Sequence, residues 1–268
     1  MLINVVILFI KDLLPIFILL CLIGTNTPKN TISMKSVLAI VLISCVGVFI
    51  SFNTLPLVSE LFDGLGVEII QSIELLLVYI CLLFGSGYIV NQHKLTLWQS
   101  NLMIIGTALF VVINSTQFIL FLDSYMTNGD AIKNTTIGLV IGLGICLSFS
   151  ALLYFLMCWF IDKAYYFLTY FIWAVFITGN LSQLINLLQQ VDIIEGSGAI
   201  WDSSQFVKDS SEYGHLLTTL FGYEASPSFE FIMLYVISLL VFLIYFLKQS
   251  SSKRQCEIDS AKENEDVL

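Results

Sequence analysis

The sequence predicts an all-α membrane protein with seven transmembrane helices. Hydrophobic residues make up 57% of its 268 residues and charged residues only 12%, whereas soluble domains are about a quarter charged. The apolar residues gather in seven segments, each near the length of about 20 residues that a helix needs to cross the hydrocarbon core. We therefore expect one membrane domain over residues 1–248 and a polar, disordered cytoplasmic tail over residues 249–268.

The predicted spans are separated by polar connections. The second span is the shortest, and the connection at 189–228 is the only long one between two spans. In chain order, the spans cover Asn4–Ile23, Ser36–Phe52, Ile69–Val90, Leu102–Leu122, Thr136–Ile161, Tyr165–Leu188 and Phe229–Leu247.

Basic residues predict the orientation of the spans. Only Lys133 and Lys208 lie in connections that follow even-numbered spans. Basic residues are enriched on the cytoplasmic side of membrane proteins. We therefore expect a multi-pass protein of the cytoplasmic membrane with its N-terminus outside and its C-terminus inside. The basic residues expected in the cytoplasm are Lys29, Lys35, Lys94, Lys163, Lys248, Lys253, Arg254 and Lys262.

The first span contains two adjacent charged residues, Lys11 and Asp12. A charge at the centre of a span costs about 2.5–3.5 kcal/mol on insertion scales. We expect both side chains to face the interior of the protein, an aqueous cavity or an ion path.

An internal repeat links the first and fourth spans. The segment that begins at Asp12 aligns with the segment that begins at Asn114, and Pro15 then aligns with Gln117. The first and fourth spans have two spans between them, so the copies run in opposite directions, as in the inverted repeats of secondary transporters. The sequence thus predicts two inverted three-helix repeats plus a seventh helix. Asn114 and Gln117 share one helix face, where they either line a site or join helices by hydrogen bonds.

The chain resembles the oxidase-dependent iron permeases. The resemblance is carried by Trp201-Asp-Ser-Ser, by the segment from Gly214 through Phe-Gly-Tyr223 to Pro227-Ser228, and by the Gly-rich helix from Gly138 to Gly144. It covers nearly the whole chain and implies seven spans with the N-terminus outside. It also implies uptake of iron, with a ferroxidase or a periplasmic iron-binding protein as partner at the outer face.

The functional motif of that family, Arg-Glu-Gly-x-Glu, is replaced here in both copies. Lys11-Asp-Leu-Leu-Pro15 stands in the first span and Ile113-Asn-Ser-Thr-Gln117 in the fourth, while the family's Glu-x-x-Glu motif becomes Glu68-Ile-Ile-Gln71. Ferric iron prefers anionic oxygen ligands, and amides offer only dipoles. Pro15 also frees a backbone carbonyl, a candidate neutral ligand. The expected metal ligands are Asp12 and Glu68, and the expected transport path contains Lys11, Asp12, Asn114, Gln117 and Glu74.

Two interpretations of function stay open. The first is an iron-permease-like transporter for iron, another cation or a small polar solute. The second is a non-transporting homologue, a structural or regulatory subunit of a membrane complex.

We expect no enzyme activity and no permanently bound cofactor, because protease, hydrolase, haem and copper motifs are absent from the sequence. We also expect His93 and His215 to be surface residues. The partners expected are the lipid bilayer and the ferroxidase or periplasmic protein. A net charge of −9 argues against nucleic acid.

The orientation can be tested at Cys256 in the tail. We expect an impermeant thiol reagent to leave Cys256 unlabelled in intact cells and to label it after permeabilisation, once the other five cysteines are replaced. Labelling of Cys256 in intact cells would show that the C-terminus lies outside, contrary to the predicted orientation.

Overall fold

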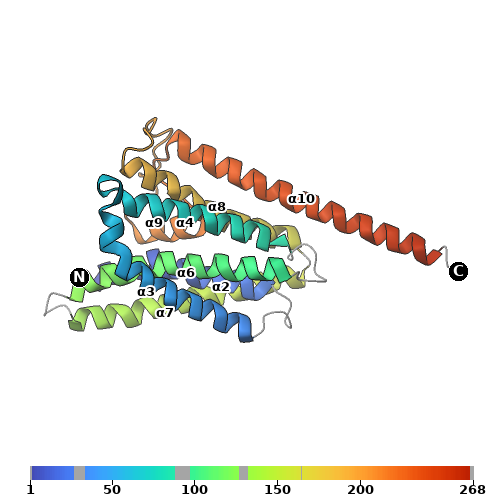
Figure 1. Cartoon of the computed structure of the whole chain (residues 1–268), viewed down its shortest axis with the longest axis horizontal. Helices are drawn as coiled ribbons and strands as arrows, with labels where there is room; N and C mark the ends of the chain where they lie inside the picture. The colour runs from blue at the N-terminus through green and yellow to red at the C-terminus, as the bar shows by residue number, and fades with distance from the viewer. Residues whose placement is uncertain (1, 27–33, 88–96, 127–131, 164, 266–268) are drawn as a thin grey trace.

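The computed structural model describes residues 2–26, 34–87, 97–126, 132–163 and 165–265. Within these ranges the chain is a helical bundle without β-strands (Figure 1). Seven of its helices are long and apolar enough to cross a membrane, which confirms the predicted fold class.

The first span is built from three consecutive helical pieces, and a short helix lies in the long connection before the last span. The elements are α1 (Leu2–Leu8), the π-helix η1 (Phe9–Leu13), α2 (Leu14–Asn26), α3 (Met34–Ser59), the 3₁₀-helix η2 (Leu61–Gly64), α4 (Gly66–Gly85), α6 (Leu97–Met126), α7 (Ile132–Asp162), α8 (Tyr166–Gln190), α9 (Glu212–Phe221) and α10 (Phe229–Glu265).

The second span is longer than the sequence predicts. Helix α3 extends to Ser59 through Pro56 rather than ending near Phe52. Asn53 and Thr54 donate side-chain hydrogen bonds to the carbonyls of the preceding turn, so the helix continues across these polar residues.

The last helix also differs from the expectation. Helix α10 continues to Glu265, beyond the start of the segment expected to be disordered. No glycine or proline interrupts this stretch, and extending an existing helix avoids the cost of nucleation. The expected end of the third span at Val90, and the basic residues Lys29 and Lys94, lie outside the described residues.

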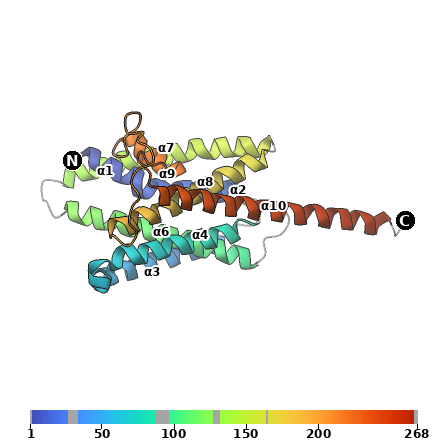
Figure 2. The same cartoon turned by 90° about the horizontal axis from the view of Figure 1, so that it is seen from above.

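The spans differ in how much protein covers them. The first span and α8 are each 56% buried over their most apolar stretch, whereas α3 is 6% buried and α7 is 11% buried. Apolar side chains on the outside of a bundle are expected where lipid is the solvent. Figure 2 shows α3 and α7 on opposite sides of the bundle.

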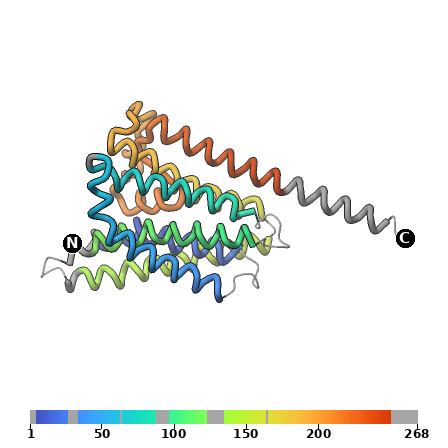
Figure 3. The backbone as a smooth tube through the Cα atoms, viewed as in Figure 1, coloured from blue at the N-terminus to red at the C-terminus, as the bar shows by residue number. Residues whose placement is uncertain are grey.

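The helix contacts follow the predicted inverted repeat in part. Helix α7 packs against the first span as α3 packs against α6, and α4 packs against α8. In a complete repeat, α8 would pack on the first span as α4 packs on α6. Here α9 packs between α8 and the first span instead. Figure 3 shows the chain passing back and forth along the bundle.

Helix α9 is held against α8 by two glycines. Gly222 ends α9 in the left-handed conformation, with φ 66°. A Cβ atom on Gly179 of α8 would lie 2.6 Å from the Gly222 nitrogen, which is too close for a real contact. The backbones therefore approach one another only because both residues lack side chains.

This close approach predicts different effects for two alanine substitutions. Gly179→Ala should lower the free energy of unfolding by about 1–3 kcal/mol, because the added methyl group meets backbone. Gly144→Ala is the matched control, since a Cβ there meets nothing within 4 Å, and it should be neutral or stabilising by up to about 1 kcal/mol. Thermal unfolding of the two purified variants in detergent measures the difference. Equal stability would contradict the tight contact.

Candidate functional site

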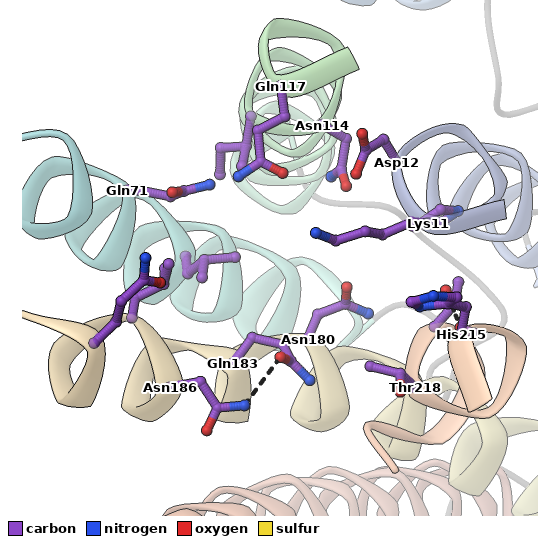
Figure 4. Close-up of a pocket in the computed structure, with 16 residues that line it drawn as sticks. Lys11, Asp12, Gln71, Asn114, Gln117, Asn180, Gln183, Asn186, His215 and Thr218 are labelled. Carbon is purple, nitrogen blue, oxygen red and sulfur yellow. Dashed lines mark hydrogen bonds between the residues drawn. The ribbon is translucent and has the colours of Figure 1, made fainter. Parts of the chain in front are cut away.

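A polar cavity of about 290 Å³ lies between the first span, α4, α6, α8 and α9 (Figure 4). Its lining includes one lysine, one aspartate, one histidine and two threonines, in addition to a set of amide side chains. These amides are Gln71, Asn114, Gln117, Asn180, Gln183, Asn186 and Gln190.

The charged pair reaches the cavity from a π-helical turn. The backbone N–H of Leu14 donates to the carbonyl of Phe9, five residues earlier. The next bond in this register would come from Pro15, which has no N–H, so the carbonyl of Ile10 lacks a donor within its own helix. The hydroxyl of Thr219 on α9 approaches that carbonyl at 3.4 Å, while it also donates to the carbonyl of His215 at 2.8 Å.

This contact changes the role predicted for Pro15. The backbone carbonyl that proline frees was expected to be available to a metal. The hydroxyl of Thr219 lies 3.4 Å from it, so the turn contacts α9. Single π-turns inside α-helices are frequent at functional sites.

The two charged side chains take different positions. Lys11 is exposed, whereas Asp12 is only 4% exposed. Figure 4 shows Lys11 extending into the space between the amides of α4 and α6 and those of α8, while Asp12 points toward Asn114. They form no salt bridge with each other or with another described residue. The cavity therefore holds two fixed charges of opposite sign at separate places.

Two of the amides are oriented in the same way on different helices. The side-chain nitrogens of Asn114 and Asn180 each donate to the carbonyl four residues earlier, at 2.8 Å. Their side-chain oxygens stay available as acceptors. Gln71 and Gln117 make no hydrogen bond to other described residues, so each offers both donors and an acceptor.

Helix α9 contributes His215 and Thr218 to the cavity wall. Burial lowers the pKa of His215, and the positive charge of Lys11 lowers it further, against a smaller opposite effect of Asp209. The imidazole is therefore neutral at pH 7. His215 was expected to be a surface residue, but it is half-buried and lines the cavity, because α9 folds back against α8 and the first span.

A carboxylate outside the cavity contacts its amide wall. Asn186 donates to the Oε1 of Gln183 and to the Oε2 of Glu224. Burial raises the pKa of Glu224, and the bond from Asn186 opposes that rise.

The structure brings together most of the predicted path. Lys11, Asp12, Asn114 and Gln117 all line the cavity. Glu74 lines a neighbouring groove between α3, α4 and α6, which shares Gln71, Ile113 and Gln117 with the cavity.

Glu68, the second predicted metal ligand, lines neither the cavity nor the groove. Its Oε2 is buried without a hydrogen-bond partner among the described residues. No cluster of three or more histidine, cysteine, aspartate or glutamate residues that could hold a metal occurs in the described part of the chain.

Sequence reasoning missed the contribution of α8. Asn180, Gln183 and Asn186 are spaced by three residues within an apolar span, which places them along one helix face. That regular spacing was the available signal.

No family model, curated protein or solved structure matches the chain. The site is therefore interpreted from its own chemistry. A cavity with two opposite charges and many free amide groups can hold a small solute by hydrogen bonds.

The lowered pKa of His215 predicts an acid-dependent loss of stability. In the unfolded chain His215 binds a proton near pH 6.5, whereas in the folded protein it does so only at lower pH. Because the unfolded state binds more protons in this window, stability should fall as the pH drops through 6.5 toward the folded pKa. His215→Gln should reduce this fall, measured as the melting temperature of purified protein from pH 7.5 to 5.5. An unchanged pH profile in the variant would contradict the burial of His215.

Proposed function

We propose that this protein is a permease that moves a small polar solute through the cavity between the first span, α4, α6, α8 and α9. The observation that carries the proposal is the cavity itself, in which charged and amide side chains from five parts of the bundle converge. Polar residues inside a membrane bundle are costly and commonly mark substrate paths. Four of the five lining elements, namely the first span, α4, α6 and α8, are spans of the predicted repeat, and secondary transporters place substrate sites between their repeats.

The resemblance to iron permeases gives a second candidate, uptake of iron or another cation with a ferroxidase or periplasmic partner. Asp12 in the cavity wall favours it. A ferric ion needs several anionic oxygen ligands, however, and Asp12 is the single carboxylate that lines the cavity in the described structure. Lys11 adds a repulsive positive charge. The cavity is therefore better matched to a solute that forms many hydrogen bonds.

In the alternative of a non-transporting subunit, Lys11 and Asp12 would have only a structural role. A structural Lys11 and Asp12 would be expected to pair with each other, as buried charges usually do. Instead, Lys11 extends into the cavity. This separation favours a solute path over a structural ion pair.

Transport can be tested with the purified full-length protein in lipid vesicles. The vesicles are assayed for uptake of labelled ferrous iron, ferric citrate, alanine, propionate, urea and choline. We expect uptake of at least one organic solute, and Asp12→Asn should reduce it at least about tenfold, which corresponds to about 1.4 kcal/mol. Asp162→Asn is the matched control, because Asp162 is exposed at the end of α7.

The outcomes separate the candidates. Uptake of iron alone would support the cation permease. Absence of uptake for every solute by correctly folded protein, or equal uptake by Asp12→Asn, would favour the subunit.

A further inference from the structure

We propose that the cavity recognises a small organic carboxylate that also carries hydrogen-bond donors, with Lys11 as the group that binds the carboxylate. A zwitterionic amino acid is the simplest molecule of this class. The inference rests on the proposed function, since it takes the cavity to be the substrate site.

The first argument is the state of Lys11. It is exposed and lines the cavity, whereas its neighbours Ile10 and Asp12 are buried. No salt bridge to a described residue neutralises its charge. An ammonium group inside a membrane protein is stabilised by an anionic partner, and a ligand carboxylate would supply one.

The second argument is that Asp12 does not take this role. Its side chain points toward Asn114 on α6, whereas Lys11 extends toward the middle of the cavity. A positive and a negative group are thus presented to different parts of a bound molecule. This arrangement matches a ligand that is itself anionic at one end and rich in donors, or cationic, at the other.

The amides supply the remaining complementarity. Asn114 and Asn180 have their nitrogens bonded to their own helices, so they present oxygens that accept from N–H or O–H groups of a ligand. Gln71 and Gln117 have unengaged amide groups on the wall formed by α4 and α6, and their N–H groups can donate to a carboxylate beside Lys11. A solute with both acceptors and donors would satisfy both sets.

The other titratable groups near the cavity do not supply a competing cation. His215 faces Lys11 and is kept neutral at pH 7 by burial and by the lysine charge. Glu224 accepts a hydrogen bond from Asn186, so its carboxylate is already engaged beside the wall. Lys11 is therefore the one positive charge among the described lining residues at neutral pH.

Four compounds of nearly the same size isolate the contribution of the carboxylate. Propionate and propionamide differ in charge, and alanine and alaninamide repeat that difference with an added ammonium group. Binding is measured by titration calorimetry at pH 7.5 with the purified full-length protein. We expect alanine to bind tightest and propionate next, with propionamide and alaninamide at least about tenfold weaker than their carboxylates.

Variants of Lys11 then test whether this residue binds the carboxylate. Lys11→Gln should weaken alanine binding at least about tenfold, whereas Lys11→Arg, which keeps the charge, should restore most of the affinity. Lys163→Gln is the matched control, because Lys163 is exposed after α7 and outside the cavity. Gel filtration and helical circular dichroism confirm that each variant folds.

The inference fails if propionamide binds as tightly as propionate, if Lys11→Gln binds alanine like the wild type, or if none of the four compounds binds. Its failure can be told apart from failure of the permease proposal. Binding of neutral amides together with vesicle uptake would retain the permease and reject the carboxylate. Carboxylate binding that depends on Lys11, without uptake of the bound compound, would retain the site and reject the permease.

Discussion

The cost of placing charges inside a membrane governs the arrangement of this bundle. Lys11 and Asp12 stand within an otherwise apolar span, and each would cost about 2.5–3.5 kcal/mol if it faced lipid at mid-membrane. The first span is accordingly one of the most buried, while α3 and α7 take the lipid-facing positions. The polar residues of α4, α6 and α8 then meet the charged turn at one cavity.

The local structure of the charged turn depends on the same constraint. Pro15 removes a donor from the first span, and an unsatisfied carbonyl in a membrane costs several kcal/mol. The hydroxyl of Thr219 on α9 lies 3.4 Å from the Ile10 carbonyl of the π-turn. A helix-breaking residue thus links the charged turn to α9, which supplies another part of the cavity wall.

The sequence predicts the parts of this structure that depend on local pattern. Apolar length identifies the seven spans, and the match between Asp12 and Asn114 correctly brings these residues to one cavity. The position of α9 could not be predicted in the same way. It depends on the close approach of Gly179 and Gly222, residues far apart in the chain. His215 was therefore assigned to the surface, and the amides of α8 were overlooked because their partners come from distant segments.

The departure from repeat symmetry explains the chemical asymmetry of the cavity. In one half, α4 packs directly on α6, and the wall there consists of amides and apolar residues. In the other half, α9 separates α8 from the first span and brings His215 and Thr218 opposite Lys11. A strictly symmetric bundle would bring α8 against the first span as α4 meets α6, and would fill the space that the lysine enters. The short helix α9, which packs between α8 and the first span, thus leaves Lys11 a place among neutral hydrogen-bonding groups of the cavity wall.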